Sequence, residues 1–159
     1  VIRATFAACD AHADDALCTG LFHRFGTGAA WRVLPGAHAA LAAVRAAGLP
    51  VYACSNFDAR VHRILRDCGL HCDAVFASSE YGAAKPDPTI LEAACAAAGC
   101  RSVDLLHIGD HQREDAGACA ACGARFLPVE RGAGIDPARL AAALGEHPTG
   151  LQPGNITSG

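Results

Sequence analysis

The sequence of 159 residues has no methionine, one tryptophan and a single lysine among its thirteen basic residues. It contains no apolar run close to the roughly 20 residues that a membrane-spanning helix needs, and no block of basic residues. The net charge of −3 gives no attraction to polyanions. We therefore expect neither a membrane nor a nucleic acid as a partner.

The chain begins at Val1, whereas translation starts with methionine, so we expect further residues before it in the whole protein. Its nine cysteines are an odd number, and most fall in segments with a helix or strand pattern. Buried, reduced thiols in an intracellular, cytoplasmic protein explain this better than a disulfide framework. Cys119 and Cys122 have CxxC spacing inside a helical segment without a second ligand pair, so we expect no zinc site.

What the sequence does contain is an alternation of strands and helices, in a chain that is 52% hydrophobic and long enough for one compact core. Short apolar runs at 50–54, 74–77, 103–108 and 125–129 predict strands, and segments with helical spacing lie between them. This order predicts an α/β fold, a Rossmann-like parallel sheet with helices on both faces. We assign residues 1–30 to a helical segment, 31–145 to the α/β core and 146–159 to a disordered tail.

Polar residues follow three of these strands, at the edge where ligands bind in parallel sheets. Ser55 and Asn56 follow the first strand, and their hydroxyl and backbone N–H groups suit a phosphate oxygen, although a simple turn before a helix explains them too. Lys85, the lone lysine, precedes a proline-rich helix start, where a compact ammonium can meet a transferring phosphoryl group. A solvated surface lysine is the alternative.

The third strand leads into Asp110 and Asp115, which span a turn into the next helix. Two carboxylates at this spacing suit Mg²⁺, which takes few protein carboxylates together with water and substrate phosphate. The alternative is a helix N-terminus stabilised by acidic residues in its first turn. We interpret His107 as a satisfied core residue within the strand, and His111 as a neighbour of the site that can contact substrate.

The order of these features resembles three motifs of the haloacid dehalogenase superfamily. Those motifs are a serine after one strand, Lys-Pro after the next, and Gly-Asp-x₄-Asp-x-Gly-Ala (109–118) after a third. The resemblance covers roughly residues 31–129 and implies a phosphatase that acts on a small phosphorylated substrate through an aspartyl-phosphate, with Mg²⁺ as cofactor. It implies phosphate binding by Ser55 and Asn56, a catalytic and phosphate-binding role for Lys85, and metal binding or orientation by Asp110 and Asp115.

One element of that family pattern is missing, because no D-x-D motif follows an apolar strand in this chain. The acidic residues at 10, 14 and 15 have the wrong spacing and helical surroundings, so we interpret residues 1–30 as a remnant of a helical cap. The core at 31–145 then lacks its first strand and its nucleophile. We expect this chain to be inactive on its own, and unstable or prone to aggregation, because a central strand is absent.

Two other functions remain open at this point. Metal-independent 2-haloacid dehalogenases share the serine and lysine but usually lack the Gly-Asp of the third motif, so Asp110 and Asp115 favour Mg²⁺-dependent phosphate chemistry. A non-catalytic binding protein is the second alternative. The residues that precede Val1 would distinguish it from an enzyme, since they either encode a D-x-D motif or do not.

Overall fold

The computed structural model describes residues 2–145, so the tail expected at 146–159 lies outside the described residues. Four short strands form the centre of the molecule: β1 (Tyr52–Ser55), β2 (Ala74–Ala77), β3 (Leu106–Gly109) and β4 (Arg125–Pro128). The helices are α1 (Ile2–Ala7), α2 (Asp15–Phe25), α3 (Ala37–Ala46), α4 (Arg60–Asp67), α5 (Ser78–Tyr81), α6 (Thr89–Ala98), α7 (Gly117–Cys122) and α8 (Pro137–Gly145). Three single turns complete the order: the 3-10 turns η1 (Gly28–Ala30) and η2 (Ser102–Asp104), and the π-helical turn η3 (Gln112–Ala116).

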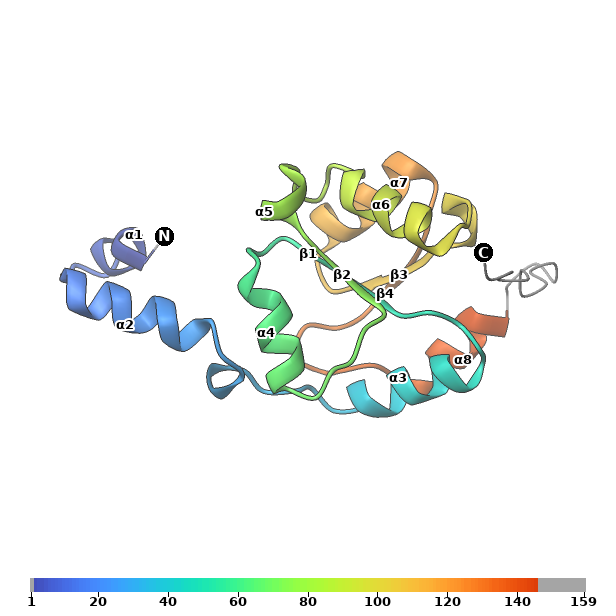
Figure 1. Ribbon diagram of the computed structural model, residues 1–159, viewed down its shortest axis with the longest axis horizontal. Coiled ribbons are helices and arrows are strands. Elements are labelled where there is room, and N and C mark those ends of the chain that lie inside the picture. The colour runs from blue at the N-terminus through green and yellow to red at the C-terminus, as the bar shows by residue number, and fades with distance from the viewer. Residues whose placement is uncertain (1, 146–159) are drawn as a thin grey trace, which may run out of the picture.

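Helices cover both faces of the strands, which confirms the predicted α/β class. Figure 1 shows α5, α6 and α7 on one side of the strand layer and α3, α4 and α8 on the other. Helices α1 and α2 extend away from this body at one end. None of the helices within residues 2–145 is long and apolar enough to span a bilayer.

The strands form two separate parallel pairs, whereas the sequence predicts one sheet. β1 pairs with β2 from Tyr52↔Ala74 to Ser55↔Ala77, and β3 pairs with β4 in the same parallel sense. Among the described residues, β1 and β3 do not pair with each other. The two pairs are therefore joined by side chains and by the helices that pack on them, not by a continuous backbone ladder.

Two clusters of buried core residues lie between the strands and the α6–α7 layer. Phe76 of β2 packs with Ile90 and Ala94 of α6, because the i, i+4 spacing places both α6 residues on the face that meets the strands. A second cluster joins Leu91 of α6 to Ala118 and Cys119 of α7. Apolar burial of this kind, at roughly 25 cal/mol per Å², fixes α6 and α7 against the strands.

Local signals in the sequence set several helix starts. Asp14 caps α2 by accepting a hydrogen bond from the backbone N–H of Leu17 at 2.7 Å. Asp87 accepts one from the N–H of Thr89 at 2.9 Å at the start of α6, and Asp136 accepts one from Ala138 at 2.9 Å in α8. Each of these hydrogen bonds satisfies a backbone donor that the start of a helix leaves free.

One segment differs from the sequence prediction and another refines it. The strand expected from residue 103 begins only at Leu106, because residues 102–104 form the turn η2, where Leu105 N–H bonds to Ser102 O at 3.0 Å. The turn expected between Asp110 and Asp115 contains the π-helical turn η3, which leads into α7 at Gly117. Such single π turns occur frequently at functional sites.

Candidate functional site

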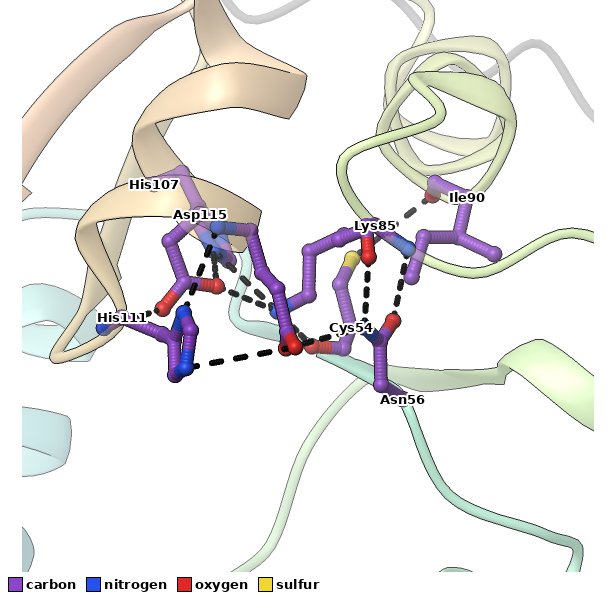
Figure 2. A network of polar contacts seen from close by, with 8 residues as sticks. Cys54, Asn56, Lys85, Ile90, His107, His111 and Asp115 are labelled. Carbon is purple, nitrogen blue, oxygen red and sulfur yellow. Dashed lines mark hydrogen bonds and ion pairs between the residues drawn. The ribbon is translucent and has the colours of Figure 1, made fainter.

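The side chain of Lys85 is buried at the centre of a polar network between the two strand pairs. Its loop connects α5 to α6, and its Nζ donates to the backbone oxygen of Cys54 in β1 at 2.9 Å and to Asp115 Oδ1 at 2.6 Å. The same Nζ lies 3.4 Å from His107 Nε2 in β3. Figure 2 shows these groups converging on the ammonium. Lys85 therefore links β1 to the β3 side of the molecule where no backbone ladder does within residues 2–145.

Asp115 is the buried anion that compensates this charge. Its Oδ1 faces Lys85 and His107, at 2.6 and 2.9 Å, and its Oδ2 accepts the backbone N–H of His111 at 2.9 Å. Burial alone would raise the pKa of Asp115, but the hydrogen bonds from these three donors and the charge of Lys85 lower that pKa to about 2. The carboxylate is thus ionised at neutral pH.

Two glycines of the third motif allow this close packing. A Cβ atom on Gly109 would lie 2.3 Å from Asp115 Oδ2, well inside van der Waals contact. A Cβ on Gly117 would lie 2.9 Å from Cβ of Pro86, the residue after Lys85. Glycine at these positions lets the end of β3 approach the carboxylate and lets α7 approach the Lys85 loop. The spacing of the motif therefore has a steric explanation in this chain.

Asn56 holds the backbone of Lys85. Its Oδ1 accepts the Lys85 N–H at 2.7 Å, and its Nδ2 donates to the Lys85 carbonyl at 2.7 Å. The same Nδ2 donates to Glu114 Oε2 at 3.0 Å. These contacts give Asn56 a clear role in placing Lys85, a role that sequence reasoning does not identify. Its expected contact with phosphate stays a prediction.

Ser55 lies in different surroundings from Lys85. It is the last residue of β1 and lines a cavity of about 210 Å³ together with Trp31, Phe57 and residues of α4. Successive strand residues point to opposite faces, which accounts for the different surroundings of Ser55 and its neighbour Cys54. The phosphate-binding role of Ser55 stays a prediction.

Asp110 follows β3 directly and is exposed at the surface. Its Oδ2 forms an ion pair with Nε of Arg131 at 3.0 Å, and nothing in the sequence predicts this partner. The sequence groups Asp110 with Asp115 as metal-binding residues, but the structure gives the two carboxylates different partners. Asp115 has both oxygens engaged, whereas Asp110 has a water-accessible carboxylate.

The two aspartates differ in whether their carboxylate is free to bind a metal ion. No group of three or more His, Cys, Asp or Glu side chains within residues 2–145 is arranged to hold a metal ion. Mg²⁺ usually takes one or two protein carboxylates and completes its shell with water and phosphate. The exposed carboxylate of Asp110 is compatible with such a partial set of ligands, whereas both oxygens of Asp115 already have partners.

Cys54 contributes a thiol to the same network, next to the Lys85 ammonium. Burial raises the pKa of its thiol to about 12, even though the charge of Lys85 acts in the opposite direction. The thiol donates to the carbonyl of Ile90 at 3.6 Å (Figure 2). Since the thiolate is the reactive form, Cys54 is a core residue and no nucleophile at neutral pH.

A larger cavity of about 900 Å³ lies between helices α1 and α2 and the core. Arg60 connects its two sides, because its Nη1 donates to the carbonyl of Phe22 at 2.6 Å and its Nη2 pairs with Asp58 at 2.7 Å. The guanidinium also stacks on the Phe22 ring, 3.7 Å from the centroid. Asn56 lines this cavity, so the cavity reaches the residue that holds Lys85.

Comparison with known proteins decides the family. The family model for haloacid dehalogenase-like hydrolases matches residues 3–123. The chain belongs to the haloacid dehalogenase-like hydrolase family.

Among curated relatives, haloacid dehalogenase-like hydrolase domain-containing protein 3 of Danio rerio is 32% identical over 96% of this chain and 67% of its own length. The proteins of the same name in Bos taurus and Homo sapiens are 35% and 34% identical, over 87% of this chain and 56% of theirs. The chain thus spans a little over half to two thirds of these relatives.

Solved structures agree with this family at the level of the fold. An L-2-haloacid dehalogenase superposes with a TM-score of 0.69 at 22% identity, over 82% of this chain and 56% of that chain. A haloacid dehalogenase-superfamily hydrolase from Geobacter sulfurreducens gives 0.60 at 21% identity, over 70% and 60%. A predicted phosphoglycolate phosphatase from Haemophilus somnus gives 0.60 at 22%, over 69% and 50%. An L-2-haloacid dehalogenase and a predicted phosphatase therefore both share the fold of this chain.

Proposed function

We propose that the whole protein is a Mg²⁺-dependent phosphatase that hydrolyses a small phosphoester through an aspartyl-phosphate. The observation that supports it best is the placement of the only lysine of the sequence, buried and paired with an ionised carboxylate between β1 and β3. A fixed ammonium in a dry site is worth far more to a developing phosphoryl charge than the same group in water. The nucleophilic aspartate lies, in this proposal, outside the 159 residues.

In this mechanism Lys85 is the catalytic residue that neutralises the phosphoryl group and the nucleophile. Asp115 keeps the ammonium oriented, and Asn56 fixes the backbone that carries it. Ser55 binds phosphoryl oxygens, and Asp110 is the residue that would hold the metal. When bound, Mg²⁺ supplies positive charge to the phosphate oxygens and orients them.

Metal-independent dehalogenation is the alternative chemistry that the same lysine can support. The two are separated by assaying the protein expressed from its complete gene on an aryl phosphate and on 2-chloropropionate. We expect phosphate release that EDTA abolishes and that Mg²⁺ restores. Chloride release that is insensitive to EDTA, without phosphate release, would replace this proposal with the dehalogenase.

The proposed domain organisation makes a second, independent prediction. We propose that residues 1–30 belong to a helical cap and that a further strand pairs between β1 and β3 in the whole protein. The separation of the two strand pairs and the partial coverage of the relatives support this. We expect the 159-residue chain alone to be inactive and to aggregate, because exposed strand edges pair with other chains. A soluble monomer with one cooperative thermal transition would contradict it.

We also propose that the protein works inside the cell. All nine cysteines, each within the described residues, are free thiols, which suits a reducing compartment. Fractionation of cells that express the complete gene with a C-terminal tag tests this, and recovery from the culture medium would oppose it.

A further inference from the structure

One oxygen of Asp115, Oδ1, contacts both Lys85 and His107. The ion pair accounts for the contact with Lys85 but not for the contact with His107. Oδ1 accepts from Lys85 Nζ at 2.6 Å and lies 2.9 Å from His107 Nε2. Lys85 and Asp115 are buried and His107 is largely buried, with exposed side-chain fractions of 8%, 6% and 11%. The imidazole is therefore part of the same dry network as the ammonium (Figure 2).

The geometry fixes which ring nitrogen of His107 carries the proton. Oδ1 of Asp115 pairs with the Lys85 ammonium, and a carboxylate only accepts hydrogen bonds, so the 2.9 Å contact places a hydrogen on Nε2 of His107. The same hydrogen prevents Nε2 from accepting a hydrogen bond from Lys85, in agreement with the longer separation of 3.4 Å. The network then consists of an imidazole and an ammonium that both donate to one carboxylate oxygen.

The imidazole is also held in place from its own strand pair. His107 lies within β3, and its register partner in β4 is Phe126. The two rings stack with their centroids 6.4 Å apart and an interplanar angle of 25°. A donor on a strand, with its ring plane fixed by packing, is held more accurately than a donor on a loop.

We propose that His107 is a positioning residue for Lys85, which acts by locking the carboxylate of Asp115. Its Nε2–H holds Oδ1 in the plane where that oxygen meets the ammonium, while the N–H of His111 holds Oδ2. Without the imidazole N–H, the carboxylate keeps two of its three donors and can rotate away from Lys85. The catalytic consequence rests on the proposed function, whereas the placement of Lys85 does not.

Two substitutions separate the hydrogen bond from the packing. His107→Phe keeps a ring to stack on Phe126 and removes the donor, whereas His107→Gln places an amide N–H at about the reach of Nε2. His62→Phe is the matched control. His62 is an exposed residue of α4 and pairs with Glu80 of α5, away from Lys85. All are made in the protein expressed from its complete gene, and their thermal transitions are compared first.

The first readout is the rate at which an amine-acylating reagent modifies Lys85, followed by peptide mapping. Loss of one charge-assisted hydrogen bond should raise this rate about tenfold or more in His107→Phe, and not in His107→Gln or His62→Phe. An unchanged rate in His107→Phe overturns the proposal. Equal rates in the Phe and Gln variants also overturn it, because the donor would then not matter. If the Phe variant does not fold, His107→Met replaces it as the variant without a donor.

The second readout is aryl phosphate hydrolysis. A positioning role predicts that kcat falls about 10- to 100-fold in His107→Phe with KM little changed, and that His107→Gln recovers most of it. A loss of kcat that Gln does not recover overturns the positioning role. If the wild-type protein releases no phosphate at all, the proposed function fails, and the modification rates still decide the role of His107.

Discussion

The two aspartates of the third motif lie five residues apart and have opposite surroundings. Asp115 is 6% exposed and has three hydrogen-bond donors, from Lys85, His107 and the backbone of His111. Asp110 is 41% exposed and pairs with Arg131, whose side chain is 75% exposed. One residue type therefore has two environments in one segment: Asp115 is a buried counter-ion of Lys85, and Asp110 is a carboxylate accessible to water.

The difference between the two aspartates follows from the free-energy cost of burying a charge. A buried carboxylate is tolerated only when its charge and its hydrogen-bonding capacity are satisfied, so Asp115 and its partners depend on one another. An exposed pair is screened by water and contributes little. We therefore expect changes at Asp115 to affect folding, and changes at Asp110 to affect ligand binding with little effect on folding.

Asp115→Ala, made in the protein expressed from its complete gene, should destabilise the fold more than any other change at these two aspartates. It leaves the Lys85 ammonium buried without its anion, so the free energy of unfolding should fall by about 3–5 kcal/mol. Urea denaturation measures this. Asp110→Ala is the matched control and should change the free energy by less than about 0.5 kcal/mol. Similar losses in both variants would remove the distinction between the two aspartates.

Gly109→Ala tests the same distinction sterically. The new Cβ would collide with the carboxylate of Asp115, so we expect a loss of about 1–3 kcal/mol in the free energy of unfolding. Gly20→Ala is the control, because nothing lies within 4 Å of its Cβ position in α2 and alanine is the better helix former. We expect the control to stabilise the protein by up to about 1 kcal/mol. An unchanged free energy of unfolding in Gly109→Ala would mean that the Asp115 side chain can move aside without cost.

The pH dependence of stability depends on Asp115 through its low pKa. Because the pKa is about 2 in the folded protein and about 3.9 in an unfolded chain, the unfolded state binds the proton more readily. The stabilisation, about 2 kcal/mol, is present above about pH 5 and is lost as the pH falls towards 2. Urea denaturation from pH 6 to pH 3 measures it, with Asp115→Asn as the variant that lacks this contribution. Equal slopes in both would contradict the assignment.

The sequence predicts the fold better than it predicts the contacts within the site. The strand at 74–77 coincides with β2, since four apolar residues between turn signals leave little choice. The strand expected from residue 103 starts three residues later, because Asp104 closes a turn that apolar pattern alone does not reveal. The split into two strand pairs is a property of tertiary pairing and has no local signal.

Within the site, the sequence identifies Lys85 by its rarity but not by its partners. Asp115 is 30 residues away in the chain, and no local pattern indicates that the two side chains meet. His107 is expected to be a satisfied residue in a strand, and the structure adds that its partner is Asp115. Asn56 has no sequence signal for its contact with the Lys85 backbone. Residue types indicate the chemistry, and only the fold supplies the pairs.

Arg131 is the ion-pair partner of the exposed Asp110, and its removal should change stability very little. Arg131→Gln removes the cation that competes for Asp110. The free energy of unfolding should change by less than about 0.5 kcal/mol. The Mg²⁺ affinity measured by calorimetry should rise about two- to fivefold, because that ratio corresponds to the free energy of one exposed ion pair. The gain should shrink as salt rises, because salt already screens the pair. Asp110→Asn should weaken binding in the same assay. An affinity that responds to Asp115→Asn but not to Asp110→Asn would reverse the roles assigned to the two carboxylates.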